Sequence, residues 1–304
     1  MYARMGKEHA ERSIIIRRLT MTCWSLRNRL LPLLWADTEG CVSHTRYDYT
    51  TGTGGGGLHL YAQCIYLSNH RAIAAHVRIF SVDLSFFHAP EDLVTKLVDC
   101  LVRLPNLKTL EILSAGSRAP ISKALKRKYA VFPSIRELRI TPACHHFVRK
   151  CPNLDSLIFT STMDTHAPST IRSHGGGLKR LAGVTVYDRN VLHWVTWGCP
   201  NLREIGVVGS TKSDREQFKL FRKLKYLAVI DIDLAQENDH PADWESTRVI
   251  YKRELVRILK DSPSRERKFL RWKVVQRRTR ALDDDRPYDV VEKEELEVCQ
   301  ETSF

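Results

Sequence analysis

The sequence predicts an α/β protein: a short, irregular solenoid with parallel strands on one face and helices on the other. A segment of the form Leu-x-x-Leu-x-apolar recurs along the chain, and proline stands two positions before it in four copies. Stretches with apolar residues at helical spacing separate the copies. One strand and one helix cannot bury their apolar surface alone, so neighbouring copies are expected to share a core.

The repeated segment begins at seven anchor residues, Val77, Leu107, Ile135, Leu154, Leu178, Leu202 and Leu224. The anchors are 30, 28, 19, 24, 24 and 22 residues apart, and most spacings match the roughly 20–29 residues of leucine-rich repeats, whose core is L-x-x-L-x-L. The pattern predicts parallel strands at 107–112, 135–140, 154–159, 202–207 and 224–229. The alternative is an ordinary α/β domain whose strands resemble one another by chance.

The repeats depart from a regular leucine-rich pattern. Asparagine is expected three residues past each strand, and those positions hold Ala115, Ala143, Thr162 and Ser210. We therefore expect an uneven solenoid without an asparagine ladder at these positions. Each strand is entered through a bend, because proline fixes φ and cannot continue a helix.

Helices are predicted between the strands. Residues 91–104 place apolar side chains at steps of three and four, and residues 213–221 begin with Ser213 and Glu216 at capping-box spacing before Phe218 and Phe221. Shorter helical pieces are predicted around Val148 and Val195. The apolar set of the first helix is Leu93, Leu97, Cys100, Leu101 and Leu104.

A family resemblance begins before the repeats. Residues 19–37 read LTMTCWSLRNRLLPLLWAD, residues 69–82 read NHRAIAAHVRIFSV, and Cys-Pro-Asn-Leu precedes two of the strands. Together these segments resemble the fungal F-box proteins with degenerate leucine-rich repeats. The resemblance implies a substrate-recognition adaptor of an SCF-type ubiquitin ligase, whose repeats hold a protein substrate. It also implies that a Skp-type adaptor docks on the F-box-like residues Leu26, Leu30, Leu34 and Trp35.

The F-box is expected to be truncated or degenerate. F-boxes of the family begin with a Leu-Pro-x-Glu segment, and residues 1–18 contain none. An alternative interpretation of residues 19–37 is an amphipathic helix that caps the open end of the solenoid. Two further alternatives remain open for the whole chain: an interaction scaffold with no ligase role, and nucleic-acid binding.

Four segments are predicted. Residues 1–40 form a partial F-box-like helical segment, 41–70 a glycine-rich linker, 71–262 the leucine-rich-repeat domain, and 263–304 a charged strand pair and tail. The linker contains the glycine-rich run TGTGGGG, which lacks the Gly-Lys-Ser/Thr ending of a phosphate-binding loop.

Composition and motifs exclude several classes of function. The eight cysteines are scattered rather than arranged as a disulfide framework, and no stretch reaches the roughly 18 apolar residues of a membrane helix. A cytoplasmic or nuclear protein without membrane contact is therefore expected. His145 and His146 diverge by about 100° on a helix, which argues against a metal site. No nucleophile and base are paired, so we expect neither enzymatic activity nor a cofactor.

Charge is concentrated near the C-terminus of a chain whose formal net charge is +13. Residues 251–280 hold twelve Lys or Arg against three acids, and residues 281–304 hold nine acids against two bases. We expect these two blocks to pair, with two strands at 268–275 and 286–291. Nucleic-acid binding through 251–280 is the alternative.

A partner-binding surface is predicted on the strands. The apolar residues of each repeat face the core, so their neighbours face outward along the sheet. The mixed charges of these neighbours suit a protein partner better than a phosphate backbone. The predicted surface comprises Thr109, Glu111, Glu137, Arg139, Ser156, Arg180, Glu204 and Tyr226.

Overall fold

The structure of the chain is a computed structural model. The structure describes residues 15, 18, 19, 21, 24–40, 55–84, 91–115, 118–126, 130–161, 167–185, 189–210, 218–236, 241–277 and 288–298. The predicted capping box at Ser213 and Glu216 lies outside them. Two compact units divide the chain, Met1–Leu154 (unit 1) and Asp155–Phe304 (unit 2), and each is described by itself.

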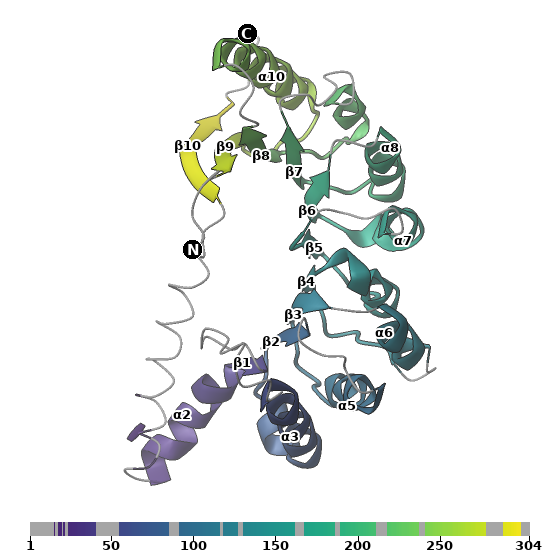
Figure 1. The fold of residues 1–304 in the computed structure, drawn as a ribbon, viewed down its shortest axis with the longest axis vertical. Coiled ribbons are helices and arrows are strands. Elements are labelled where there is room, and N and C mark those ends of the chain that lie inside the picture. The colour runs from purple at the N-terminus through teal and green to yellow at the C-terminus, as the bar shows by residue number, and fades with distance from the viewer. Residues whose placement is uncertain are drawn as a thin grey trace. The chain divides into compact units, whose positions relative to one another are not determined.

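Unit 1 is a parallel sheet with helices on one side (Figure 1). Its strands pair in chain order, and Thr109 lies between Ile79 and Glu137 in register. The strands are β1 (Asp37–Gly40), β2 (Ile79–Leu84), β3 (Thr109–Ala115) and β4 (Glu137–Ile140). The helices are α2 (Trp24–Ala36), α3 (Gly55–Asn69), α4 (Arg71–Ala74), α5 (Glu91–Val102), α6 (Arg118–Leu125) and the 3-10 helix η1 (Pro142–Lys150).

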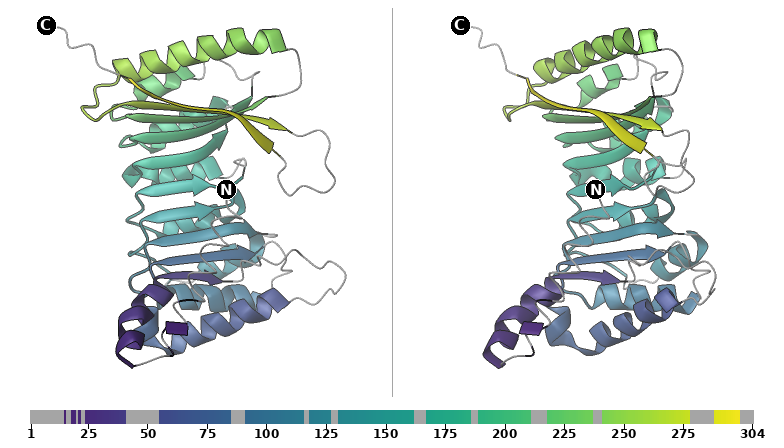
Figure 2. Two further views of the ribbon diagram at one scale, coloured as in Figure 1. Left: turned by 90° about the vertical axis from the view of Figure 1, so that its left-hand side faces the viewer. Right: turned by 60° about the vertical axis from the view of Figure 1, so that its left-hand side comes forward.

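Unit 2 repeats this plan and ends in an antiparallel strand pair (Figure 2). Strands β5 to β9 pair in parallel and in chain order, whereas β10 runs antiparallel to β9. The strands are β5 (Ser156–Phe159), β6 (Arg180–Thr185), β7 (Glu204–Ser210), β8 (Val229–Gln236), β9 (Phe269–Arg277) and β10 (Tyr288–Glu297). The helices are α7 (Ala167–His174), α8 (Arg189–Gly198), α10 (Pro241–Asp261) and the 3-10 helices η2 (Gly175–Gly177) and η3 (Lys219–Lys223).

The α/β class with a mostly parallel sheet is therefore shown, and four of the five predicted strands start two residues later than expected. The fifth prediction, 224–229, was out of register, because β8 spans Val229–Gln236. Glu204 pairs with Val229, so the residue equivalent to Leu202 is Leu227 rather than Leu224. Leu224 instead opens the turn that precedes the strand.

A β-turn precedes the strands and explains the Cys-Pro-Asn-Leu motif. The amide of Leu202 donates to the carbonyl of Cys199 at 3.2 Å, and that of Leu154 donates to the carbonyl of Cys151 at 3.3 Å. Proline presets φ at the second position of such a turn, and asparagine suits the third. The motif thus reverses the chain between a helix and the next strand.

The asparagine of this turn binds the preceding repeat. Asn106 donates through Nδ2 to the carbonyl of Ala75 at 2.8 Å, Asn153 to that of Pro133 at 2.9 Å, and Asn201 to that of Gly176 at 2.9 Å. Each acceptor stands two residues before the anchor of its own repeat. We call these three contacts the turn ladder. It lies before the strands, whereas leucine-rich repeats were expected to carry asparagine after them.

Both units bury the apolar residues that were predicted to form the core. In unit 1 the five apolar residues predicted for the first helix are buried, four of them on α5 and Leu104 just after it, as are Leu110 and Ile112 of β3. In unit 2 Phe218 and Phe221 are buried. Cys199 is fully buried, and burial raises the pKa of its thiol to about 12. Such a thiol stays protonated at neutral pH and packs as a small apolar side chain.

The N-terminal part of unit 1 corrects one expectation. Residues 55–69 form helix α3 instead of a linker, because Leu60, Cys64 and Leu67 recur at helical spacing and are buried. In α2 the F-box-like residues are partly buried: Leu30, Leu34 and Trp35 are half-buried, and Leu26 is 39% exposed.

Candidate functional site: the strand faces of the two units

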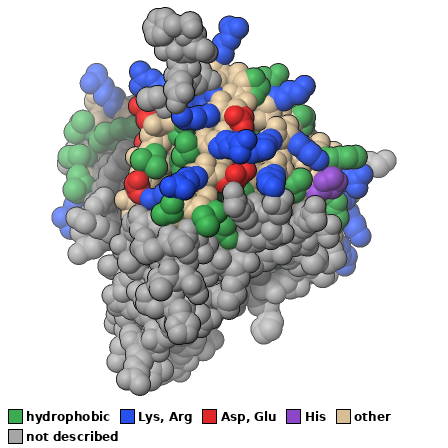
Figure 3. All heavy atoms as spheres, turned by 90° about the horizontal axis from the view of Figure 1, so that it is seen from above, with side chains coloured by type: hydrophobic (Ala, Val, Ile, Leu, Met, Phe, Trp, Pro, Cys, Tyr) green, Lys and Arg blue, Asp and Glu red, His purple; other side chains and the backbone are tan. Residues whose placement is uncertain are grey.

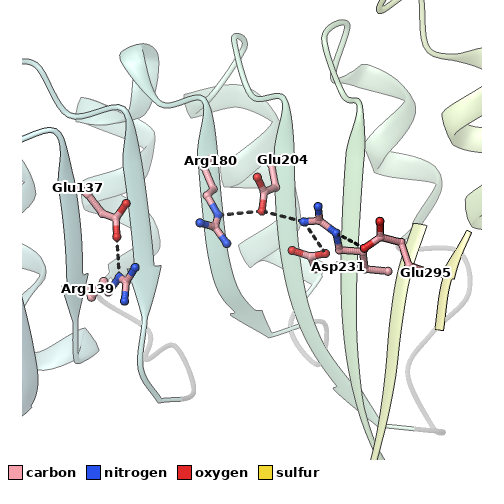
Figure 4. Close-up of polar contacts among 7 residues, drawn as sticks. Glu137, Arg139, Arg180, Glu204, Asp231 and Glu295 are labelled. Carbon is pink, nitrogen blue, oxygen red and sulfur yellow. Dashed lines mark hydrogen bonds and ion pairs between the residues drawn. The ribbon is translucent and has the colours of Figure 1, made fainter. Parts of the chain in front are cut away.

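In unit 1 the strand face turned away from the helices carries a row of paired polar groups. Ser81, Glu111 and Arg139 are cross-strand neighbours in register. Ser81 donates to Glu111 Oε2 at 2.7 Å, and Arg139 Nη1 lies 3.1 Å from Glu111 Oε1. Arg139 also donates through Nε to Glu137 at 2.6 Å (Figure 4). Burial opposes its charge, yet the two carboxylates raise the pKa of Arg139 overall.

Unit 2 carries a longer row that runs from β6 to β10 (Figure 4). Arg180 Nε lies 2.8 Å from Glu204 Oε1, and the same oxygen lies 3.8 Å from Arg271 Nη1. Arg271 also lies 3.6 Å from Asp231 Oδ1 and 3.0 Å from Glu295 Oε2. One guanidinium therefore joins three carboxylates from three strands.

Asp231 is the acid of this row whose negative charge is least stabilised by its surroundings. Burial, followed by the charge of Glu204, raises the pKa of its carboxyl to about 6, although Arg271 acts in the opposite direction. The Oδ1 atom is buried without a hydrogen-bond donor, and the side chain as a whole is 28% exposed. The carboxylate can therefore accept a further donor from solvent or from a ligand.

Six of the eight predicted surface residues lie partly exposed on a strand face, whereas Ser156 and Tyr226 do not. Thr109, Glu111, Glu137 and Arg139 lie on the strand face of unit 1, and Arg180 and Glu204 lie on that of unit 2. Ser156 pairs with Arg180 in register but is only 8% exposed, because its short side chain lies beside the long arginine. The expectation of exposure was wrong there.

Tyr226 does not belong to the strand face. It lies in the turn before β8 and is 50% exposed, and Val229 occupies the position opposite Glu204. Sequence reasoning also missed Ser81, Asp231, Arg271 and Glu295. An alignment anchored on Leu227 would have found Asp231, two residues after Val229 on the same face.

A cavity of about 250 Å³ opens on the strand face of unit 2. Ala182, Gly183 and Gly206 line it from β6 and β7, and Asp231 and Asp233 line it from β8. We call it the unit 2 hollow. Gly183 has φ of +76°, and a Cβ there would lie 2.3 Å from the carbonyl oxygen of Phe159. A Cβ on Gly206 would lie 2.7 Å from that of Ala182. Backbone geometry thus excludes side chains at these two positions. The hollow is also lined from β9 and β10, by Arg271, Trp272, Lys273, Lys293, Glu294 and Glu295.

The oppositely charged C-terminal blocks pair, as expected. Arg271 binds Glu295, Lys252 forms an ion pair with Glu294, and β9 and β10 form the predicted strand pair. Seen from above, Lys and Arg side chains lie among acidic and apolar ones (Figure 3). Two of the basic residues of 251–280, Lys252 and Arg271, are therefore held by acids of the following block.

The described ranges contain neither a metal-binding group nor a membrane-spanning helix. No three His, Cys, Asp or Glu side chains there are placed to hold a metal ion. His145 Nδ1 instead lies 2.8 Å from the carbonyl oxygen of Pro142. None of the helices in the described ranges has the length and apolar character needed to cross a membrane.

Comparison with known proteins identifies no family. No protein-family model matches the chain, and no curated protein matches it. The F-box resemblance therefore stays a prediction based on residues 19–37 and the motifs of the repeats.

Proposed function

We propose that this chain is a non-catalytic protein-binding module, a short irregular leucine-rich-repeat solenoid that recognises a protein partner through its strand faces. The observation that carries the proposal is the pair of charged rows, one in each unit. Both rows combine acidic and basic side chains from neighbouring strands and lie on the face turned away from the helices.

The arginines of these rows are suited to a protein partner. The side chains of Arg139, Arg180 and Arg271 are 37%, 38% and 44% exposed, yet each is held by carboxylates. A partner that binds them loses little additional side-chain entropy, because the guanidinium groups are already oriented. Rows of mixed sign also favour one complementary partner over a uniform polyanion.

The strand-face proposal is tested by removing one arginine from each row. In Arg139→Gln/Arg180→Gln the acids lose their partners, whereas the matched variant Arg149→Gln/Arg253→Gln removes two exposed arginines from the helices. Partners are captured from cell extract by cross-linking and quantified by mass spectrometry. Loss of a charged interface contact costs about 2–5 kcal/mol when it is buried, so at least tenfold lower recovery is expected for the first variant alone. Equal recovery by a folded strand-face variant would refute the proposal.

We further propose that the partner is a substrate and that the module is an adaptor of an SCF-type ubiquitin ligase. Helix α2 supports this role, because Leu26 and Leu33 lie one heptad apart and are 39% and 49% exposed. These apolar side chains, with half-buried Leu30, Leu34 and Trp35 beneath them, would contact the Skp-type adaptor. A scaffold without a ligase role would not need these exposed apolar side chains on α2.

The ligase role is tested by calorimetry with a purified Skp-type adaptor. We expect the parent chain to bind and Leu26→Asp/Leu33→Asp to lose binding, since a charge would be desolvated at the contact. Leu19 provides the matched control, because it is also exposed but lies outside α2. If the parent chain gives no heat of binding, the adaptor role is refuted. The chain would then be an interaction scaffold with no ligase role.

A further inference from the structure

Two cysteines meet between helices α3 and α5 of unit 1, which pack against each other. Cys64 lies on α3 and is 1% exposed, and Cys100 lies on α5 and is fully buried. Both are thiols, and the Cys64 thiol donates a hydrogen bond to the sulfur of Cys100. Two sulfurs that are 36 positions apart in the sequence are therefore in direct contact.

Two polar residues complete the surroundings of Cys100. Ser68, one turn after Cys64 on α3, donates a hydrogen bond to Cys100 through its hydroxyl, and the positive charge of Arg103 acts on the same thiol. The guanidinium of Arg103 is itself held, because Nη1 donates to the carbonyl of Ser68 at 3.0 Å. Two hydrogen-bond donors and one cation thus stabilise negative charge on one sulfur atom.

These neighbours distinguish Cys100 from other buried cysteines of the chain. Burial raises the pKa of the Cys144 thiol to about 11 and that of Cys199 to about 12. At Cys100 the hydrogen bond from Cys64, helped by Ser68 and Arg103, outweighs burial and lowers the pKa of the thiol below its ordinary value of 9.0. Cys100 therefore supplies more of the nucleophilic thiolate at neutral pH than an ordinary buried cysteine does.

The pair lies beneath side chains that reach the protein surface. Ser68 is half-buried and Arg103 is exposed, and both act on Cys100. Side chains at the surface change rotamer within nanoseconds. A small oxidant can therefore reach the sulfur of Cys100 without unfolding of the core.

We propose that Cys64 and Cys100 are a peroxide-responsive thiol pair that closes a reversible disulfide between α3 and α5. The Cys100 thiolate attacks hydrogen peroxide, the O–O bond breaks, and Cys100 becomes a sulfenic acid while hydroxide leaves. The sulfur of Cys64 then attacks the sulfenic sulfur, the S–O bond breaks, and the hydroxyl group leaves as water with the thiol proton of Cys64. The hydroxide takes up the proton that Cys100 had released, so two thiols and one peroxide give one disulfide and two waters.

The disulfide would fasten α3 to the repeat that contains α5. Helix α3 also carries Tyr66, whose ring stacks on that of Trp35 on α2 with centroids 5.8 Å apart. Oxidation would therefore tie the contact that holds the F-box-like residue Trp35 to the repeats. The chemistry of the pair is independent of the strand faces and of partner binding. A thiol reductant would restore both cysteines by exchange.

The test uses the full chain, treated with hydrogen peroxide in native buffer and then alkylated with N-ethylmaleimide in denaturant. Trypsin releases Cys64 within residues 47–71 and Cys100 within residues 97–103, and neither peptide contains another cysteine. We expect mass spectrometry to find these two peptides joined as the main oxidised product of either cysteine, and dithiothreitol to separate them. Cys199 should be alkylated in the same sample and is the internal control.

Matched variants separate the disulfide from its activation. Oxidation should raise the Tm of the parent chain by about 5 °C, because the cross-link restricts the unfolded chain, and should leave that of Cys100→Ser unchanged. Arg103→Gln keeps both cysteines but removes the cation, so the linked peptides should form about threefold more slowly. This variant also serves if Cys100→Ser does not fold.

Two results would overturn the proposal. One is separate alkylation of Cys64 and Cys100 after peroxide treatment of the folded chain, and the other is a sulfinic or sulfonic acid at Cys100 without the linked peptides. Neither result depends on a binding partner, so failure of the thiol pair can be told apart from failure of the proposed function.

Discussion

The two units share one repeat geometry but differ in what covers their strand faces. In unit 1 the row from Ser81 to Arg139 lies on strands whose described positions hold no glycine. In unit 2 Gly183 and Gly206 interrupt the side-chain layer and leave a hollow beside Asp231. The pairing of the strands thus sets which side chains point to the strand face. The size of those side chains decides whether a cavity remains on it.

The largest effect is expected when the hollow loses its left-handed glycine. Gly183→Ala would place a Cβ 2.3 Å from a backbone oxygen of β5 at a φ of +76°. We expect the free energy of unfolding to fall by about 3 kcal/mol, because both backbone strain and displacement of a strand contribute. Urea denaturation measures the change. Gly176→Ala is the matched control, since its Cβ would meet nothing within 4 Å. Equal stability of the two variants would show that the open face is not imposed by the backbone.

The turn ladder is common to both units, so removing one of its hydrogen bonds should lower the free energy of unfolding by the same amount in each. Asn153→Ala in unit 1 and Asn201→Ala in unit 2 each delete one hydrogen bond of 2.9 Å to a carbonyl of the preceding repeat. We expect each to lower the free energy of unfolding by about 1 kcal/mol in urea titrations. Asn→Ser substitutions at the same sites keep a turn-forming residue and separate the loss of the contact from the loss of turn propensity. A large cost in only one unit would contradict a shared turn geometry.

An effect that depends on pH is expected from the titration of Asp231, which belongs to the open face alone. Its folded pKa of about 6 lies above the ordinary value of 3.8, so the folded chain binds the proton more tightly than the unfolded chain. Stability should therefore decline as the pH rises from about 4 to 6, and remain lower above that range. Urea unfolding of the parent chain and of Asp231→Asn across this range measures the difference, which should shrink toward pH 4. If the difference in stability between the two chains did not change with pH, the charge of Asp231 would be fully stabilised in the folded chain.

Much of the fold could be predicted because it depends on local patterns. Alternating apolar residues such as Leu110 and Ile112 indicate a strand, and the spacing from Leu93 to Leu104 indicates the helix before it. The segment LKRLAGV is one residue longer than its relatives, which matches the register shift of β6 between Leu181 and Val184. Patterns of this kind depend only on neighbouring residues.

The candidate site was harder to predict, because it depends on register between distant strands. Arg271 meets Glu204, Asp231 and Glu295 only after β7 to β10 have paired. A shift of three residues in the alignment at Leu224 was enough to select Tyr226 and to hide Asp231. The hollow also depends on an absence of side chains, which composition does not reveal.

The turn ladder also bears on how such a chain can change over generations. The acceptors of its three asparagines are backbone carbonyls of an alanine, a proline and a glycine, and any residue supplies a carbonyl. A repeat copied by gene duplication can therefore join its neighbour without a matching substitution in it. The copies can then diverge at outward-facing positions. New binding specificities can arise in this way without changes to the hydrogen bonds of the turn ladder.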